Sequence, residues 1–395
     1  MTGVQMNAFD WLARLVEFDT TSYKSNLNLI EDVAGHLDDS GASVRLIHNN
    51  DSTKANLFAT FGPERGGGIV LSGHSDVVPV DGQPWDTDPF VMSEREGCFY
   101  GRGTTDMKGF IACALALAPD ILTSDINLPI HIALSFDEEV GCLGVRSMIE
   151  VIGRELPPPR LAIVGEPTEM RVANAHKGIS QQTTVVTGRD GHSSRPGSGV
   201  NAVAYGAEII GYLDSLAVEY SQAANNSNRF EPPGTTFNIG LITGGTAVNI
   251  IARECTFRWE FRPTPDVDPK EVLARLDGFV KSEILPRMRA VDADANVSTT
   301  VDIAAPTLEV VADSPAEKFA LSLAGSNAPV AMSYVCEAGL FSNAGIPSIV
   351  CGPGSVSEAH QPNEFIAFEQ LDSCTNFLNR LLTSVVNGTF NEVSI

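Results

Sequence analysis

The sequence predicts an α/β protein whose mostly parallel central sheet, flanked by helices, is interrupted by an inserted α+β domain. Four short apolar runs each end in a polar motif, and helix-like segments alternate with these runs. Between residues 178 and 303 the pattern changes to a different order of strands and helices. Short, continuously apolar strands that alternate with helices are typical of a parallel sheet covered on both faces. A length of 395 residues accommodates about two or three domains.

The chain begins with an amphipathic helix whose apolar face carries Phe9, Leu12, Leu15 and Val16. Further elements of the α/β part follow from helical spacing or from continuous apolar runs. The helices are expected at 29–37, 107–118, 143–152, 315–323, 337–343 and 368–385. The strands are expected at 43–47, 56–61, 69–71, 130–136, 161–164 and 348–351.

The middle of the chain has the order β-α-β-β-α-β, which is typical of a small ferredoxin-like domain. Its predicted elements are strand 181–186, helix 201–212, strands 236–242 and 255–261, helix 269–280 and strand 296–303. Residues 222–233 have the composition of a loop. We therefore expect a catalytic domain in two parts, 1–177 and 304–395, with an inserted domain at 178–303.

Charge and composition limit the class of partner. The chain carries 49 acidic and 26 basic residues, which gives a formal net charge of −23. Such a chain repels phosphate backbones and anionic lipids, which argues against nucleic acid and membranes as partners. The longest apolar stretch, 110–118, is far shorter than the ~20 residues that a membrane span needs.

Cysteine usage and the N-terminus indicate a cytoplasmic location. The seven cysteines are scattered, odd in number and without a C-x-x-C pair, so we expect free thiols in a reducing compartment. The first residues lack a basic region followed by an apolar core, so no signal peptide is predicted.

Imidazoles and carboxylates follow the ends of the predicted strands or open a helix. These residues are His74, Asp76, Asp106, Glu138, Glu139, Glu166 and His360. Polar groups at such positions meet at the carboxyl edge of a parallel sheet. Two histidines with several carboxylates form a nitrogen and oxygen site suited to Zn²⁺, Co²⁺ or Mn²⁺. With this many acidic ligands two ions are expected, because one carboxylate can bridge cations ~3.5–4 Å apart.

Each of these residues also has a purely structural interpretation. Asp106 could be a helix N-cap, and adjacent Glu138 and Glu139 could be a solvated helix start. His131 lies inside an apolar run and is expected to be a buried core histidine. The joint pattern favours a metal site, because five separate coincidences at strand ends are improbable.

Seven motifs occur in the order GHSDVVP, GRGTTDMKG, DEEVGCLG, VGEPT, GHSSRP, GGTAVN and EAHQPNE. This series resembles the metallopeptidase and deacylase family that contains acetylornithine deacetylase, succinyl-diaminopimelate desuccinylase, carboxypeptidase G and aminoacylase. The stretch from Glu337 to Glu364 is most similar to acetylornithine deacetylases. The resemblance implies a zinc-peptidase-like catalytic domain and an inserted domain that serves as lid and dimerisation surface.

The resemblance also implies roles for individual residues. The five implied metal ligands are Asp106 between the two ions, His74 and Glu166 at one ion, and Glu139 and His360 at the other. Glu138 would take a proton from the attacking water and deliver it to the leaving amine. Asp76 would hydrogen-bond the imidazole of His74 and fix its tautomer.

Four residues are implied at the substrate. His192, in the inserted domain, would reach the active site of a partner subunit and stabilise the oxyanion. Asn249 would orient the intermediate, and Arg262 would bind the substrate carboxylate, with a surface residue next to Pro263 as its alternative interpretation. Gly354 belongs to a glycine-containing loop that is flexible enough to bring backbone close to a ligand. Gly191 stands where many relatives have Ala, and this departure bears on specificity more than on chemistry.

The expected function is hydrolysis of N2-acetyl-L-ornithine to L-ornithine and acetate, a step of arginine biosynthesis. The implied enzyme is a cytoplasmic homodimer, paired through the inserted domains, with two divalent ions, Zn²⁺ as first choice and Co²⁺ as second. Alternative substrates are other N-acyl amino acids, as in succinyl-diaminopimelate desuccinylase, aminoacylase or carboxypeptidase. A catalytically inactive, metal-stabilised binding protein is the alternative from another class.

Overall fold

The chain divides into two units, which a computed structural model describes over residues 6–223 and 229–392. Unit 1 comprises Met1–Asn174, Glu309–Val330 and Cys336–Ile395, and unit 2 comprises Ala175–Leu308 and Ala331–Val335. Unit 2 is therefore an insertion into the chain of unit 1, apart from its short contribution from 331–335.

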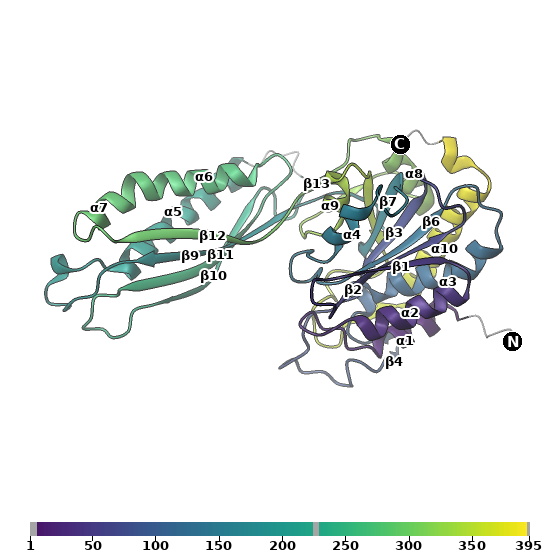
Figure 1. Ribbon diagram of the computed structural model, residues 1–395, viewed down its shortest axis with the longest axis horizontal. Coiled ribbons are helices and arrows are strands. Elements are labelled where there is room, and N and C mark those ends of the chain that lie inside the picture. Colours follow the sequence, from purple (N-terminus) through teal and green to yellow (C-terminus); the bar gives the residue numbers. More distant parts are fainter. Residues whose placement is uncertain (1–5, 224–228, 393–395) are drawn as a thin grey trace. The chain divides into compact units, whose positions relative to one another are not determined.

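Unit 1 is built on a nine-stranded sheet with the order β1-β2-β6-β3-β7-β15-β8-β13, in which β14 also pairs with β8. Figure 1 labels β1, β2, β3, β6, β7 and β13 of this sheet. The strands that precede the insertion are β1 Ser43–His48, β2 Ala55–Phe61, β3 Ile69–His74, β6 Ile130–Ser135, β7 Leu161–Pro167 and β8 Ala173–His176. The strands that follow it are β13 Leu308–Glu309, β14 Val330–Met332 and β15 Ser348–Gly352.

The four central strands β6, β3, β7 and β15 pair in parallel, whereas β1, β2 and β6 pair antiparallel at one side. Every residue of these four strands is buried, which requires helices on both faces of the sheet. The four apolar runs of the sequence become these four strands. The prediction of a mostly parallel central sheet is therefore confirmed.

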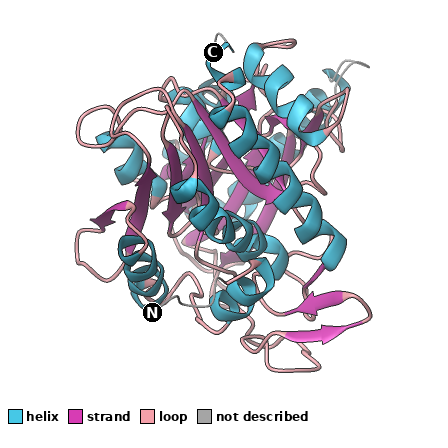
Figure 2. Ribbon diagram, turned by 90° about the vertical axis from the view of Figure 1, so that its right-hand side faces the viewer, coloured by secondary structure: helices cyan, strands magenta, loops and turns pink. Residues whose placement is uncertain are grey.

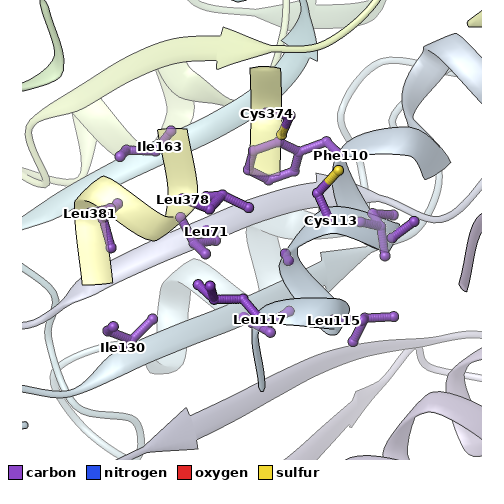
Figure 3. Close-up of a cluster of buried hydrophobic side chains, with 14 of the residues drawn as sticks. Leu71, Phe110, Cys113, Leu115, Leu117, Ile130, Ile163, Cys374, Leu378 and Leu381 are labelled. Atoms are coloured by element: carbon purple, nitrogen blue, oxygen red, sulfur yellow. The ribbon is translucent and has the colours of Figure 1, made fainter. Parts of the chain in front are cut away.

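Helices flank this sheet (Figure 2). They are α1 Ala8–Val16, α2 Leu27–Asp39, α3 Gly109–Thr123, α4 Val145–Val151, α8 Pro315–Ala324, α9 Ala338–Asn343 and α10 Phe368–Val386, with a π-turn at Thr104–Lys108 and a 3₁₀ turn at Thr389–Glu392. Helices α3 and α10 pack Phe110, Leu117 and Leu378 over Leu71 and Ile130 of the sheet (Figure 3). This apolar core fixes the strands whose ends carry the polar motifs.

A small three-stranded sheet was not predicted from the sequence. It consists of β4 Ser93–Arg95, β5 Cys98–Tyr100 and β16 Phe365–Ala367, with β5 pairing antiparallel to both others. Each strand has three residues, which is too short for a pattern of alternation to be recognised. The sheet joins the chain around residue 100 to the chain that follows residue 364.

Unit 2 has a four-stranded antiparallel sheet with the order β10-β11-β9-β12. Its elements are β9 Ile179–Thr187, α5 Ala202–Ala223, β10 Thr236–Gly244, β11 Glu254–Arg262, α6 Pro269–Phe279, a π-turn Val280–Ile284, α7 Leu285–Arg289 and β12 Asn296–Ala305, together with a 3₁₀ turn Pro196–Ser198. The order β-α-β-β-α-β matches the sequence pattern, and α5 and α6 pack on one face of the sheet (Figure 1). Burial alternates along β11, where Phe257, Trp259 and Phe261 enter the core.

Two expectations for the middle of the chain need comment. Helix α5 continues to Ala223, eleven residues beyond the predicted end at 212. The predicted loop 222–233 lies partly outside the described residues, which exclude 224–228.

All seven cysteines are free thiols, as predicted. Among the described helices, none combines the length and the apolar composition that crossing a bilayer demands.

Candidate metal centre and active site

The predicted ligands of unit 1 meet at the carboxyl edge of the parallel sheet. His74 is the last residue of β3, and Glu166 lies near the end of the neighbouring strand β7. Glu139 follows β6, which pairs with β3 on its other side. Asp106 lies in the π-turn before α3, and His360 belongs to the segment before β16. Adjacent parallel strands therefore present three of the ligands, and two loops add the others.

Asp106 lies between the two imidazoles. Its Oδ1 is 3.0 Å from Nε2 of His74, and its Oδ2 is 3.2 Å from Nε2 of His360. Nε2 of His74 is also 3.8 Å from Oε1 of Glu166, and Nε2 of His360 is 3.1 Å from Oε2 of Glu139. The five side chains thus fall into two groups that share Asp106, with one imidazole and one glutamate in each.

Two oxygens of this cluster indicate that it is suited to cations. Oε1 of Glu139 and Oε1 of Glu166 are buried and have no hydrogen-bond partner among the described residues. A buried carboxylate oxygen without a donor is unfavourable unless a cation or a water molecule satisfies it. Ligand atoms of His74, Asp106 and Glu139 all lie within 4.8 Å of one another. Imidazole nitrogens combined with carboxylate oxygens suit divalent transition metals.

The electrostatics of the cluster follow from burial and from close pairing. Burial alone would raise the pKa of Asp106, but hydrogen bonds from His360 and His74 outweigh it and hold this pKa below its ordinary value. Hydrogen bonds to Asp106 and Glu139 raise the pKa of His360 to about 11. Burial raises the pKa of Glu166 well above the ordinary value. The site therefore gathers several carboxyl groups in a buried place, where their charged form is stable only beside positive charge such as an imidazolium or a cation.

Glu138 lies beside the cluster and points to a different task. Its side chain is buried, and burial raises its pKa to about 8. Sγ of Cys142 donates a hydrogen bond to Oε1 of Glu138 over 3.2 Å. A carboxyl whose pKa lies near neutrality can both accept and release a proton at physiological pH.

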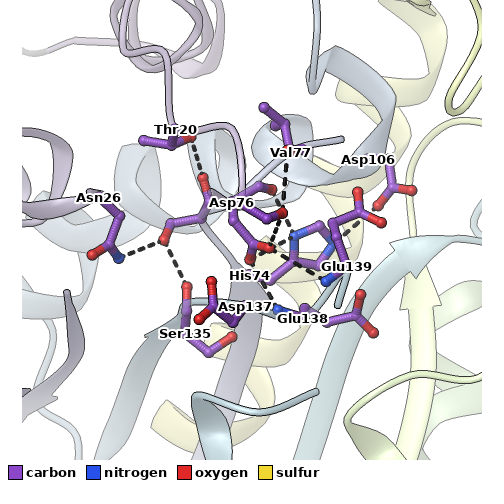
Figure 4. Close-up of polar contacts among 12 residues, drawn as sticks. Thr20, Asn26, His74, Asp76, Val77, Asp106, Ser135, Asp137, Glu138 and Glu139 are labelled. Carbon is purple, nitrogen blue, oxygen red and sulfur yellow. Dashed lines mark hydrogen bonds and ion pairs between the residues drawn. The ribbon is translucent and has the colours of Figure 1, made fainter. Parts of the chain in front are cut away.

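Asp76 supports the cluster in a way that differs from our expectation. We expected its carboxylate to hydrogen-bond the imidazole of His74, but Nδ1 of His74 bonds the backbone oxygen of Asp76 at 2.9 Å. The carboxylate is 3.7 Å from Nδ1 and accepts hydrogen bonds from the backbone N–H groups of Glu138 and Glu139 (Figure 4). Asp76 therefore holds His74 through its main chain and the Glu138–Glu139 segment through its side chain.

The backbone oxygen of Asp76 also determines the tautomer of His74. A carbonyl oxygen can only accept, so Nδ1 of His74 carries the proton. When a cation replaces the proton on Nε2, the neutral ring would offer its Nε2 lone pair to that cation, as a metal ligand requires.

His192 and Asn249 lie close together in unit 2. His192 forms an isolated β-bridge with Ile250, and the backbone N–H of Ser193 donates to the backbone oxygen of Asn249 at 3.1 Å. Nδ1 of His192 accepts from the backbone N–H of Ser194 at 3.1 Å. Because a backbone N–H can only donate, the neutral ring of His192 carries its proton on Nε2. The exposed Nε2–H is thus available as a donor.

Arg262 is distant from this pair. It ends β11, whereas His192 and Asn249 lie beyond the end of the sheet where β11 begins at Glu254. The length of β11 separates the two ends by about 26 Å, at ~3.3 Å per residue. Nε of Arg262 donates to Oε1 of Glu260 at 3.1 Å. Within unit 2 the structure therefore does not bring Arg262 to His192 and Asn249.

Gly354 contacts the loop that carries Asp106. Its φ of +86° lies in the left-handed region, and a Cβ at this position would come within 2.7 Å of Oγ1 of Thr105. Its backbone N–H donates to Oε1 of Gln370 at 3.1 Å, and its carbonyl accepts from Glu169 at 2.8 Å. A glycine is required here by the backbone and by the close approach of Thr105.

Two further buried carboxylates beside the cluster were missed from the sequence. Glu337 accepts hydrogen bonds from Oγ of Ser72 and Oγ of Ser135, and burial raises its pKa to about 7. Glu364 accepts hydrogen bonds from the loop that contains Asp106. The signal that could have found Glu364 is its place directly before an apolar strand, in the same short motif as His360.

Imidazoles and carboxylates that converge at the carboxyl edge of the sheet have the composition of a site for divalent metal ions. The chain belongs to peptidase family M20/M25/M40, whose model matches residues 70–384. It is an enzyme that hydrolyses amide bonds.

Individual relatives agree with this assignment. The chain is 35% identical over 390 residues to acetylornithine deacetylase of Myxococcus xanthus, covering 95% of this chain and 97% of the relative. Its fold is similar to that of an M20 family metallo-carboxypeptidase from Sulfolobus solfataricus, with a TM-score of 0.76, 17% identity, and coverage of 97% and 100%. The fold is also similar to that of a dinuclear metal binding peptidase of Bacillus subtilis, with a TM-score of 0.64, 12% identity, and coverage of 96% of this chain and 98% of that chain.

Proposed function

We propose that the chain is a deacylase of N-acyl amino acids and that its substrate is N2-acetyl-L-ornithine, which it converts to L-ornithine and acetate. The observation that carries the proposal is Asp106 placed between two imidazoles, with the buried carboxyl of Glu138 beside them. The acetylornithine deacetylases among its relatives support this choice of substrate. The enzyme would then act in the cytoplasm, in arginine biosynthesis.

The cluster would hold two divalent ions, Zn²⁺ as first choice and Co²⁺ as second. Asp106 would bridge the ions, His74 and Glu166 would complete one site, and Glu139 and His360 would complete the other. Oε1 of Glu139 and Oε1 of Glu166, which have no hydrogen-bond partner among the described residues, support this arrangement. Two such ions, when bound, would polarise the acyl carbonyl and lower the pKa of a water molecule.

Glu138 would move the proton. It takes a proton from the water whose oxygen attacks the acyl carbon, and it gives that proton to the nitrogen as the C–N bond breaks. The two products are then a carboxylic acid and a free amine, and Glu138 returns to its starting state. Its pKa of about 8 supports both halves of this transfer.

His192 would donate its Nε2–H to the oxyanion in the active site of a second copy of the chain. In unit 2, the connections to unit 1 lie where β9 begins and β12 ends, whereas His192 follows the other end of β9. This placement at the remote end of the sheet supports a homodimer paired through the inserted domain. Asn249, beside His192, would orient the intermediate in the same partner site.

Arg262 would bind the carboxylate of the substrate through its guanidinium group, exchanging its partner Glu260 for the ligand. Gly354 would bring backbone close to the ligand. Because Arg262 and His192 lie at opposite ends of β11, which is about 26 Å long, one copy of the chain would supply Arg262 and the other His192.

The proposal is tested with a panel of N-acyl amino acids. Protein freed of metal is reloaded with Zn²⁺ or Co²⁺, and release of primary amine is measured from N2-acetyl-L-ornithine, N-succinyl-L,L-diaminopimelate, an N-acetylated apolar amino acid and a dipeptide. Glu138→Ala, loaded in the same way, is the control for catalysis that does not come from this site.

We expect the highest kcat/KM with N2-acetyl-L-ornithine. A preference of tenfold or more for another member of the panel would replace the substrate but keep the reaction. Two bound ions without turnover of any member would instead support a metal-stabilised binding protein.

A further inference from the structure

Glu364 is a buried carboxylate that contacts the loop of Asp106 through both of its oxygens. Oε1 accepts from the backbone N–H groups of Thr105 at 2.9 Å and Asp106 at 3.0 Å. Oε2 accepts from the backbone N–H of Gly103 at 3.0 Å and from Nη1 of Arg102 at 2.7 Å. Four N–H groups within the segment 102–106 therefore donate to the side chain of Glu364, which is only 1% exposed.

This arrangement fixes the main chain at Asp106. All four partners are donors, so only a carboxylate can satisfy them at both oxygens. The loop is not part of a sheet at this point, and its shape depends on the acceptors that Glu364 provides. Glu364 therefore holds the backbone of Asp106 in the position from which its carboxylate reaches the cluster.

Arg102 and Gln83 connect Glu364 to the backbone of His360. Its guanidinium is 1% exposed and pairs with Glu364, and its Nη2 donates to Oε1 of Gln83. Nε2 of Gln83 in turn donates to the backbone oxygen of His360 at 3.0 Å. Glu364 and His360 also belong to one five-residue segment, so the ion pair is linked to His360 through the chain and through Gln83.

His360 needs such an external restraint. Its φ is +62°, a left-handed conformation that is uncommon for residues with a side chain and is stabilised by surrounding contacts. Its side chain is 52% exposed, so packing alone does not hold the imidazole in place. The hydrogen bond to its carbonyl supplies a restraint on its backbone.

We propose that the buried Arg102–Glu364 ion pair is the positioning device that sets the separation of Asp106 and His360. This separation in turn sets the affinity of the second cation site, by which we mean the group of Asp106, Glu139 and His360. Neither member of the ion pair is one of the five proposed metal ligands, and both act through the chain that carries Asp106 and His360, so both are positioning residues. The inference rests on the proposed function in one respect, namely that the Asp106–His360 group binds a divalent ion.

The test is a metal titration rather than an activity assay alone. Metal-free protein is titrated with Zn²⁺ against a competing chelator, and both dissociation constants are measured for wild type, Glu364→Gln and Glu317→Gln. Glutamine has the shape of glutamate, but its amide NH₂ would face N–H donors at one of the two edges. Glu317 is a matched control, because it is also buried and accepts hydrogen bonds from Asn174 and from the backbone of Asp313.

We expect Glu364→Gln to weaken the second site by about 10–100-fold, the range typical of residues that orient metal ligands, and Glu317→Gln to leave it unchanged. Excess Zn²⁺ should restore kcat in Glu364→Gln, with KM for the substrate unaltered. Gln83→Ala, at a less buried position, should weaken only the second site, and it serves if Glu364→Gln does not fold. Glu364→Asp, which retains the charge, should lie between wild type and Glu364→Gln.

Unchanged metal affinity in both Glu364→Gln and Gln83→Ala would overturn the inference. Equal weakening in Glu364→Gln and Glu317→Gln would also overturn it, because that result indicates general loosening of the unit. Wild-type protein that binds two ions but hydrolyses no N-acyl amino acid would reject the proposed function alone. Wild-type protein without a second ion would overturn both.

Discussion

Cys142 donates a hydrogen bond from Sγ to Oε1 of Glu138 while its own backbone has a φ of +53°. Glycine would adopt this conformation without strain, whereas cysteine adopts it at an energetic cost. The contact holds the Glu138 carboxyl in one orientation. Burial raises the pKa of Cys142 well above the ordinary value, which keeps the thiol protonated as a donor.

Removing this donor should therefore slow the chemical step. We expect Cys142→Ala to lower kcat about tenfold with KM unchanged, because the loss of one hydrogen bond has about this effect on a rate. Cys142→Ser keeps a donor and should retain most of kcat. Cys351→Ala is the control at another buried cysteine. Steady-state kinetics with N2-acetyl-L-ornithine measure the effect, and equal losses in the Ala and Ser variants would contradict it.

Loss of the proposed proton carrier should separate catalysis from metal binding. Glu138→Ala removes the buried carboxyl but none of the five proposed ligands, so kcat should fall by about 10²–10⁴ or more while metal content stays at the wild-type level. Metal content by atomic emission, compared with kcat on the same samples, makes the distinction. A parallel loss of metal would assign Glu138 to the ligands instead.

Removal of metal should destabilise unit 1. Without cations, the carboxylates of Asp106, Glu139 and Glu166 repel one another in a buried site. We expect chelation to lower the Tm and added Zn²⁺ to raise it, with about 2.7 kcal/mol gained at a free ion concentration of 100 Kd. Calorimetry with and without chelator measures the shift. His74→Ala should show a smaller gain from Zn²⁺ than wild type, and a full gain would speak against the site.

Action of His192 in a partner subunit can be tested by mixing inactive variants. His192→Ala and Glu138→Ala are each expected to be nearly inactive, with about a 10²–10³-fold loss of kcat for His192→Ala. If chains exchange, half of the dimers are mixed and each has one intact site, so about a quarter of wild-type activity should return. A mixture of Glu138→Ala and Glu139→Ala is the control. Recovery there, or none in the first mixture, would contradict the assignment.

His131 predicts a dependence of stability on pH. It lies in β6, fully buried, with Nδ1 3.0 Å from Oγ1 of Thr60, and burial lowers its pKa to about 4. Its unfolded pKa is about 6.5, so between pH 6.5 and 4 the unfolded chain binds a proton that the folded chain does not. Stability is therefore lost as pH falls through this range, by about 2 kcal/mol at pH 5.

Urea unfolding at pH 7 and pH 5 measures this effect. The difference in the free energy of unfolding between the two pH values should shrink by about 2 kcal/mol in His131→Gln. His48→Gln changes an exposed histidine of the neighbouring region and should keep the wild-type difference. An unchanged difference in His131→Gln would show that other groups determine the pH dependence.

The parallel strands could be predicted because each is a continuous apolar run, as burial on both faces demands. The polar residues at their ends could be predicted for the same reason, since parallel strands share one carboxyl edge. The structure does bring His74, Asp106, Glu139, Glu166 and His360 into one cluster.

What could not be predicted depends on the main chain. Glu364 acts on backbone N–H groups, and Asp76 holds His74 by its carbonyl oxygen, so neither contact has a side-chain signature. The three-residue strands β4, β5 and β16 form only through tertiary pairing, which outweighs weak local preference. Helix α5 exceeds its prediction because its later residues keep helical spacing without a stop signal before Ala223.

Strands β8 and β13, which the chain uses to leave the catalytic sheet and to return to it, are neighbours in that sheet. The backbone N–H of Val310 donates to the oxygen of Asn174 at 2.8 Å, directly where the excursion starts and finishes. In topological terms, unit 2 is therefore the connection between two neighbouring strands. A short turn in place of unit 2 would leave the strand order unchanged, so the order of the strands in this sheet does not depend on the insert.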